Sequence, residues 1–247
     1  MGRHVKLPKD HADSPEGRAA AGLDPFPHAP ARAAAPRSRK ERRVIDRFHR
    51  LWYDERRAFK AGHFLGTRVY KCPLDLWVYQ ELIWELRPDL VVETGTLHGG
   101  SALFFGCMLD LVDNGEVVSV DIGQLQGRPD HPRVTYLHGS STADEIVGEV
   151  RDRAAGLETV MVALDSSHRK KHVLNELRAY GPLVTPGSYL IVEDTNVNGH
   201  PADPSYGPGP WEAVEAFLAE TDDFAVDRTR EKFLMTLNPD GYLRKRG

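Results

Sequence analysis

From residue 90 onward, the hydrophobic positions alternate between short apolar runs and longer segments with helical spacing. Short runs that end at a turn or a polar residue are typical of buried strands, and apolar positions three or four residues apart indicate helices. We expect strands from residue 90 and over 117–120, 134–137, 159–164 and 188–192, with helices over 102–111, 143–153 and 170–179. This order predicts an α/β fold, a mostly parallel sheet with helices on both faces.

The preceding part of the chain has a different pattern. Apolar and aromatic residues at helical spacing predict helices over 41–60 and from about 75 to 86, joined by an irregular segment over 64–73. The first forty residues are rich in Ala, Pro and Arg without periodicity, so we expect a flexible arm or one ordered against another subunit. The predicted organisation is an arm over 1–40, a helical region for substrate or subunit contacts over 41–87, and a core over 88–247.

The C-terminal part predicts a lid and a closing hairpin. Residues 195–210 are rich in Gly, Pro, Asn and His, and this length suits a functional lid rather than a tight connection. A helix is expected to begin at Pro210. The segments Phe233–Leu237 and Tyr242–Arg244 flank the turn sequence Asn-Pro-Asp-Gly, which predicts an antiparallel β-hairpin.

A glycine-rich turn follows the strand that begins at Leu90. Its order is E-x-G-x-x-x-G-G, starting at Glu93, and it differs from the G-x-G-x-x-G pattern of dinucleotide sites. Asp121 ends the next strand, where an acid can hydrogen-bond two ribose hydroxyls. Glu93 would repel a pyrophosphate but suits the cationic amino-acid end of S-adenosylmethionine (SAM). A turn used only for tight packing is the alternative.

Polar residues end each predicted strand, and the ends of parallel strands meet at one edge of the sheet. They are Glu93, Asp121, Ser141, Asp165, Glu193 and Asp194. Asp165, Glu193 and Asp194 are expected to lie close enough to repel one another, which a divalent cation would relieve. An all-oxygen set favours Mg²⁺ or Mn²⁺, and no Cys or His pair has zinc spacing. Alternatively, each acid caps a helix or forms a single ion pair.

Composition narrows the classes of partner. The chain has 247 residues, a net charge of -4 and a pI of about 6.3, which argues against nucleic acid as the main partner. The basic run over 37–43 is interpreted as a solvated helix start rather than a nucleic-acid patch. Two cysteines without a disulfide framework favour a reducing cytoplasm. We find no signal peptide and no apolar run long enough to span a membrane.

Four motifs together carry a resemblance to a known family. They are V-E-T-G-T-L-H-G-G-S over 92–101, L-D-S-S-H over 164–168, V-E-D-T over 192–195 and G-P-G-P-W-E-A-V over 207–214. They resemble the family named cephalosporin hydroxylases, whose members look like class I SAM-dependent, Mg²⁺-dependent O-methyltransferases, including sugar methyltransferases of natural-product pathways. The resemblance covers roughly 64–244. The layout is also similar to catechol O-methyltransferase.

The resemblance implies roles for individual residues. Cofactor contacts are expected from Glu93, Gly95, Ser101, Asp121, Ser140, Ser141 and Asp165, and metal contacts from Asp165, Glu193 and Asp194. Substrate contacts are candidates at His98, His138, His200 and Trp211, each with a purely structural role as the alternative.

This sequence departs from catechol O-methyltransferase at the position of the catalytic base. That layout has a lysine three residues beyond the first metal-binding Asp, and here the position is His168. A neutral imidazole could accept the acceptor proton, so His168 is the expected base, with a structural or capping role as the alternative. Lys170 and Lys171 are nearby but displaced.

The resulting hypothesis is a SAM- and Mg²⁺-dependent O-methyltransferase that acts on a hydroxyl of a small molecule, such as a sugar or a glycosylated natural product of secondary metabolism, including antibiotic biosynthesis. A homo-oligomer is expected, by analogy with the family. One rival is an oxygenase, which would want a redox metal on two histidines and one carboxylate. Another rival is a catalytically silent binding or assembly subunit. The converging acids argue against it, because such a subunit does not need them.

Overall fold

A seven-stranded sheet organises the part of the chain that the computed structural model describes, residues 38–247. The arm predicted over 1–40 lies almost wholly outside these residues. The sheet order is β5-β4-β3-β6-β7-β9-β8. The strands are β3 (Leu90–Thr94), β4 (Glu116–Asp121), β5 (Val134–His138), β6 (Val160–Leu164), β7 (Tyr189–Val192), β8 (Phe224–Val226) and β9 (Tyr242–Lys245).

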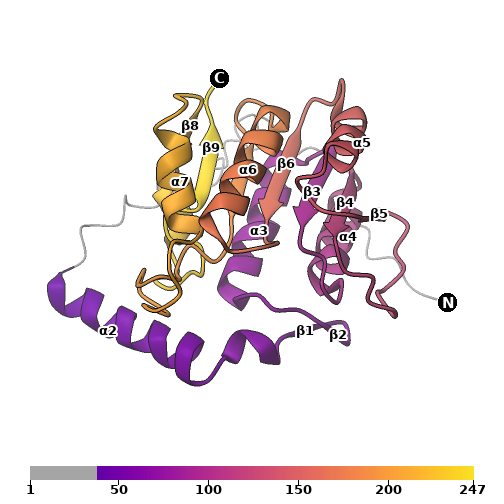
Figure 1. Ribbon diagram of the computed structural model, residues 1–247. Coiled ribbons are helices and arrows are strands. Elements are labelled where there is room, and N and C mark those ends of the chain that lie inside the picture. The colour runs from indigo at the N-terminus through magenta and orange to yellow at the C-terminus, as the bar shows by residue number, and fades with distance from the viewer. Residues whose placement is uncertain (1–37) are drawn as a thin grey trace, which may run out of the picture. The chain divides into compact units, whose positions relative to one another are not determined.

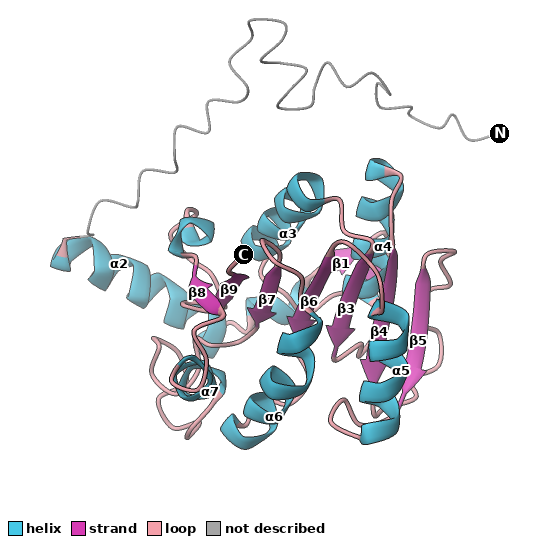
Figure 2. Cartoon of the chain, turned by 90° about the horizontal axis from the view of Figure 1, so that it is seen from above, coloured by secondary structure: helices cyan, strands magenta, loops and turns pink. Residues whose placement is uncertain are grey.

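Helices cover both faces of this sheet, as Figure 2 shows. One face carries α3 (Pro73–Leu86) and α4 (Gly100–Val112), and the other carries α5 (Asp144–Ala154), α6 (Lys170–Tyr180) and α7 (Pro210–Leu218). Successive strand residues point to opposite faces. On β3, Val91 therefore packs with the α3 and α4 residues, while Leu90 and Val92 pack with the opposite helices. The predicted α/β fold with a mostly parallel sheet is confirmed.

The direction of chain progression reverses between β3 and β6. From β3 the chain proceeds outward to β4 and β5, and it then returns to place β6 and β7 on the other side of β3. These five strands are parallel, with Glu93 opposite Ala163 in the register. Ligands of open parallel sheets bind beyond the carboxyl ends of the strands at such a switch point. The fold therefore places the candidate site beyond β3, β6 and β7.

The closing antiparallel pair differs from the predicted hairpin. β9 pairs antiparallel with β7 and with β8, whereas Phe233–Leu237 forms no strand. The buried carboxylate of Asp75 accepts hydrogen bonds from the Leu237 amide at 2.8 Å and the Thr236 hydroxyl at 2.5 Å. Those polar groups are therefore satisfied by α3 instead of a strand partner, and Phe224–Val226 takes the edge position.

The helix predicted over 41–60 is broken into three pieces. α2 (Arg39–Arg50) leads into a π-helical turn, η2 (Leu51–Glu55), and then a 3-10 turn, η3 (Ala58–Ala61). The break lies at Arg57, whose φ of 48° is incompatible with a continuing right-handed helix. The expected irregular segment contains a small antiparallel pair, β1 (His63–Phe64) with β2 (Thr67–Arg68). Figure 1 shows α2 extending away from the sheet.

Two short 3-10 segments, η4 (Gly181–Leu183) and η5 (Arg228–Glu231), complete the described elements. None of the helices within residues 38–247 combines the length and apolar character that crossing a bilayer requires. The division at residues 87 and 88 stays a prediction.

Candidate functional site

Three acids end neighbouring strands on the same face of the sheet. Glu93, Asp165 and Glu193 each lie two residues beyond a buried residue that packs on the α3 side, namely Val91, Ala163 and Ile191. The Asp165 amide donates to Thr94 and the Glu193 amide to Leu164, so the parallel pairing continues into these positions. The sheet register thus brings the predicted acids together.

Asp194 turns toward the same place by leaving the strand conformation. Its φ is 52°, and its amide donates to the side chain of Asn238 at 3.1 Å. His168 lies between two of the acids, with Nε2 3.2 Å from Asp165 Oδ1 and Nδ1 3.2 Å from Asp194 Oδ2. One donor atom from each of these three residues lies within 4.8 Å of the other two. This triad has the spacing needed to surround a cation.

A buried lysine, which no motif indicated, occupies the other side of the acids. Lys71 Nζ lies 2.7 Å from Asp165 Oδ2 and 2.5 Å from Glu193 Oε1. Tyr79 on α3 also donates to Glu193 Oε1, at 2.6 Å. The predicted metal ligand Glu193 therefore has one oxygen engaged by two donors. The only sequence signal was that Lys71 is the one charged residue in the short run Val69–Cys72 before α3.

Burial and charge compete across this cluster. Burial raises the pKa of Glu193 to about 8 and that of Asp194 to about 6, although Lys71 and His168 respectively oppose the rise. Burial alone would lower the pKa of His168, but Asp194 and Asp165 outweigh it and raise the pKa to about 9. The cluster therefore favours cations and disfavours an excess of ionised acids.

The glycine turn is packed directly against Asp165. Gly95 has a φ of 93°, and a Cβ there would come within 1.9 Å of the Asp165 carbonyl oxygen. The turn leads into the N-terminus of α4, whose free amides favour a negatively charged group. A small cavity of about 30 Å³ lies here, with Lys71, Gly95, Ser101 and Asp165 in its lining. This geometry suits the methionine end of a cofactor.

Glu93 lies behind that cavity rather than in it. The side chain is fully buried, and Oε2 accepts a hydrogen bond from Ser119 at 2.6 Å. Oε1 has no hydrogen-bond partner among residues 38–247. Burial raises the pKa of Glu93, and Lys71 opposes the rise. A cationic group near the turn would compensate this carboxylate.

Asp121 ends β4 with both oxygens occupied. Oδ2 accepts from the Leu97 amide at 2.6 Å and Oδ1 from the Gly123 amide at 2.7 Å. Arg128, which sequence reasoning missed, lies 3.2 Å from Oδ2 and donates to the Leu97 and Gly123 carbonyls. The acid is thus fixed in place between two loops, where it keeps further acceptor capacity.

The serines predicted at the adenine end lie after β5. The Ser141 hydroxyl is 3.1 Å from His172 Nε2, and Ser140 pairs with Thr142 at 3.2 Å. His138 stands beside Asp121 in the register and lies 3.0 Å from the Ile122 carbonyl oxygen. His138 therefore borders Asp121, whereas Ser141 contacts His172 on α6, and none of these residues belongs to the triad of Asp165, His168 and Asp194.

The remaining substrate candidates divide into two places. His98 packs edge-on against Tyr70 at 5.6 Å and lines the small cavity with Lys71. His200 instead stacks on Trp211 at 4.2 Å and lies 3.1 Å from the Glu212 carboxylate. His98 is therefore close to the acid cluster, whereas His200 and Trp211 belong to the packing between the predicted lid and α7.

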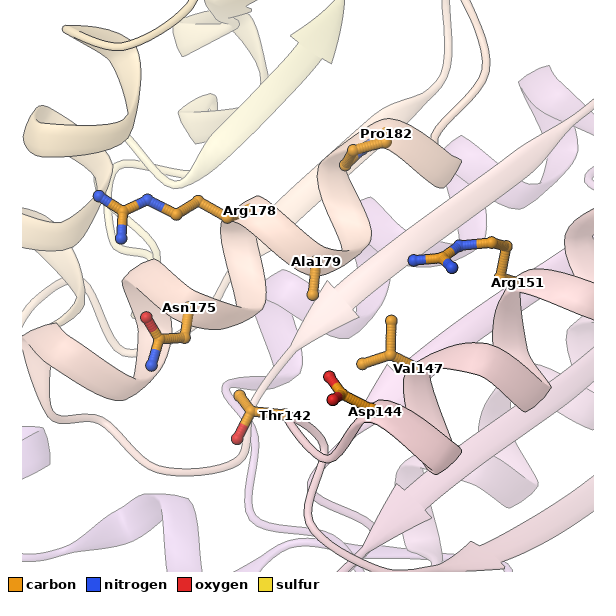
Figure 3. Close-up of a pocket in the computed structure, with 8 residues that line it drawn as sticks. All are labelled: Thr142, Asp144, Val147, Arg151, Asn175, Arg178, Ala179 and Pro182. Carbon is orange, nitrogen blue, oxygen red and sulfur yellow. The ribbon is translucent and has the colours of Figure 1, made fainter.

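A larger hollow of about 440 Å³ lies elsewhere, between α5 and α6 (Figure 3). It is lined by Thr142, Asp144, Val147, Arg151, Asn175, Arg178, Ala179 and Pro182. Arg178 is held by Glu220 through hydrogen bonds of 2.9 and 2.6 Å. None of the strand-end acids lines it, so the candidate chemistry belongs to the smaller cavity and the triad.

Comparisons with known proteins show the family of this chain. A family model described as Rhamnosyl O-methyltransferase/CmcI matches residues 56–246. Rhamnosyl O-methyltransferase of Mycobacterium tuberculosis is 37% identical over 207 residues, covering 81% of this chain and 84% of the relative. The protein of that name from Mycobacterium leprae is 38% identical over 208 residues, covering 81% and 90%.

Solved structures show the same fold. A structure of CmcI with Mg and SAM has a TM-score of 0.60 and 21% identity, covering 100% of this chain and 88% of that one. An apo structure of CmcI has a TM-score of 0.59 and 22% identity, with the same coverage.

Proposed function

The chain belongs to the Rhamnosyl O-methyltransferase/CmcI family, and from this premise we propose that it transfers the methyl group of SAM to a hydroxyl of a sugar or glycosylated natural product, with Mg²⁺ as a second cofactor. The observation that carries the proposal is the contact between the glycine turn at Gly95 and the acid at Asp165. It joins a site for a cofactor's amino-acid end to a site for a cation at one sheet edge.

SAM would bind along the ends of β3, β4 and β5. The amides at the start of α4 and the Ser101 hydroxyl would bind its carboxylate, and the negative charge of Glu93 would favour its ammonium group. Asp121, held by Arg128 and two backbone amides, would accept hydrogen bonds from the ribose. The electrophilic methyl group would then lie toward the triad.

The residues present fit a hard divalent cation. Asp165 and Asp194 offer carboxylate oxygens within one cation's reach. Glu193, whose Oε1 is held by Lys71, is the proposed third acid. When bound, Mg²⁺ would orient an acceptor hydroxyl and ease its ionisation.

His168 is the proposed base. Its ring contacts Asp165 and Asp194, so it stands beside the place where the acceptor hydroxyl must lie. Burial would lower the pKa of His168, but these acids outweigh it and raise the pKa while their charge is uncompensated. A cation bound on them would offset that charge and leave the ring neutral, able to accept a proton. A base there takes the hydroxyl proton as the oxygen attacks the methyl carbon and the sulfonium becomes a neutral thioether. Within residues 38–247, neither Lys170 nor Lys171 forms an ion pair with Asp165, Glu193 or Asp194, which favours His168 as the base.

Aromatic side chains near Asp194 support a carbohydrate acceptor. Burial, and then the negative charge of Asp194, raise the pKa of Tyr53. Burial also raises the pKa of Tyr206, where Arg169 opposes the rise and Asp194 adds to it. Tyr53 stacks on Phe59 at 4.8 Å. Such rings provide apolar faces with a polar edge, suited to a sugar with hydroxyls around an apolar ring.

A panel assay tests the function. The protein, SAM and MgCl₂ are incubated with free sugars, rhamnosides, other glycosides and a catechol, and each product is examined by mass spectrometry. We expect one added methyl group on a glycoside, and none on the catechol. Oxygen incorporation instead of methylation would support the oxygenase rival, whose two-histidine set the triad does not provide.

A second copy of the chain is the proposed partner of α2. Val44, Phe48 and Leu51 form an exposed apolar stripe on this helix, with exposed fractions of 63, 52 and 38%. α2 carries six basic and two acidic residues, whereas residues 51–247 contain 20 basic and 30 acidic ones. The charge difference favours docking of α2 on the acidic body of another copy.

Light scattering after size exclusion tests this homo-oligomer. Phe48→Asp is expected to reduce the molar mass to that of a smaller assembly, and Leu111→Asp, on another exposed apolar residue, serves as the control. Equal masses for the wild type and Phe48→Asp would remove α2 from the interface. The two free cysteines, Cys72 and Cys107, together with the dependence on SAM, lead us to propose a cytoplasmic location.

A further inference from the structure

Lys71 is the only described lysine or arginine whose side chain makes contacts to two of the strand-end acids. It is 3% exposed, and it bridges Asp165, directly after β6, and Glu193, directly after β7. Hydrogen bonds therefore form one chain from Tyr79 through Glu193, Lys71 and Asp165 to His168.

The backbone before α3 holds Lys71 firmly. The Val69 amide donates to the Gly62 carbonyl at 3.0 Å, which closes the segment that carries β1 and β2. A Cβ on Gly100 would come within 2.3 Å of the Arg68 carbonyl oxygen, so this segment lies directly against the start of α4. Lys71 therefore reaches the acids from a fixed position and not from a surface loop.

The lysine brings its ammonium group into a cluster of carboxylates. Nζ lies 2.7 Å from Asp165 Oδ2 and 2.5 Å from Glu193 Oε1, so it is paired with two acids at once. An ammonium group in this place lies in contact with the carboxylates that a divalent cation would use. Two cations that share the same carboxylates repel each other, and the repulsion is strong away from bulk water.

We propose that Lys71 is a positioning residue that shares Asp165 and Glu193 with the divalent cation and thereby weakens cation binding. It holds Oδ2 of Asp165 and Oε1 of Glu193, and the other oxygen of Asp165 faces His168. It also neutralises the acids before a cation binds. This inference rests on the proposed cation site.

Binding of Mn²⁺ alone tests the proposal, with calorimetry and the loss of free-ion EPR signal as readouts. Lys71→Met removes the charge, and we expect it to bind Mn²⁺ at least tenfold more tightly than the wild type. Lys71→Arg keeps the charge and should stay within threefold. Lys171→Met removes an equal charge from an exposed position on α6, and it should also stay within threefold. A purely structural role predicts weaker binding in Lys71→Met.

The competing outcomes are separable. If the wild type and Lys71→Met both fail to bind Mn²⁺, the proposed cation site is wrong. If the wild type binds but Lys71→Met binds equally or less tightly, the inference about Lys71 is overturned. Lys71→Gln, which keeps a donor without charge, is measured in parallel by thermal denaturation. If Lys71→Met or Lys71→Gln folds only when Mn²⁺ is present, the proposal is supported. If neither variant folds even with Mn²⁺, the proposal is contradicted.

Discussion

Gly95 and Asp165 are in such close contact that a Cβ on Gly95 would lie 1.9 Å from the Asp165 carbonyl oxygen. The two residues are 70 positions apart, yet the pairing of β3 with β6 makes them neighbours. This contact fixes the distance between the proposed SAM turn and the proposed cation site. Each site therefore depends on the backbone of the other.

Gly95→Ala is expected to lower the free energy of unfolding by about 3 kcal/mol or more and to abolish SAM binding, because overlap and the positive φ both oppose a side chain. Gly148→Ala is the matched control, since Gly148 lies in α5 with nothing within 4 Å of its Cβ position. It should raise stability by up to about 1 kcal/mol. Urea denaturation measures both, and a stable, SAM-binding Gly95→Ala protein would contradict the proposed turn.

Asp121→Ala should weaken SAM binding by roughly 1.5–3 kcal/mol, through loss of charge-assisted hydrogen bonds to the ribose. Calorimetry with SAM and with its demethylated product gives the affinity. Asp152→Ala, at an exposed position of α5, is the control and should bind like the wild type. Tight binding of NAD by the wild type, or an unchanged affinity in Asp121→Ala, would reject the cofactor assignment.

Removal of divalent cations with EDTA should abolish methyl transfer, and Mg²⁺ should restore it. Asp194→Asn should lose this activation while its stability at neutral pH stays equal or rises. The reason is that the raised folded-state pKa of Asp194 makes its ionised form unfavourable in the native protein above about pH 6. Asp165→Asn should be less stable, because Lys71 loses a partner. Full activity after exhaustive chelation would exclude the proposed cation.

His168→Ala should bind SAM and Mg²⁺ like the wild type but lose roughly 100-fold in kcat, the size of a general-base contribution. Lys170→Ala, which changes the nearest displaced rival, should remain within a few-fold. Steady-state kinetics with a saturating glycoside compares the three proteins. A His168→Ala enzyme close to the wild type would return this residue to a structural role and leave Lys170, Lys171 or His200 as candidates.

His49 predicts a loss of stability in acid. It is buried, and Asn196 donates to its Nε2 at 2.9 Å. Burial, and then Arg50, lower its pKa from 6.5 to about 4, so the unfolded chain takes up a proton first as the pH falls. The stabilisation is complete above about pH 6.5 and is lost toward pH 4, by about 2 kcal/mol between pH 7 and 5.

His49→Gln keeps an acceptor for Asn196 but cannot titrate in this range. Urea denaturation of both proteins at pH 7 and pH 5 isolates the contribution of His49 from that of other groups. If the variant and the wild type lose equal stability over this interval, the lowered pKa of His49 is not coupled to folding.

Local sequence patterns determined the sheet, the glycine turn and the set of acids. Apolar runs indicated most of the segments that become strands, and each acid follows its run directly, so the rule that parallel strand ends share one edge was enough to predict that Asp165 and Asp194 lie close together. Glu193 joins them through its shared contact with Lys71. The family resemblance also rests on local sequence, since three of its four motifs are strand ends with the turns that follow them. The chemistry expected at His168 also came from a spacing of three residues.

Tertiary structure alone decided which groups neutralise those acids. Lys71 lies 94 residues before Asp165 and 122 before Glu193, and His49 lies 147 before Asn196. Such contacts depend on how the segment before α3 crosses the sheet edge, which no local periodicity records. β8 was missed for a related reason. An edge strand of three residues has little pattern of its own, and it pairs with the free edge of β9. The Leu237 amide donates to Asp75 and its carbonyl accepts from Asn196, so Leu237 is paired outside the sheet.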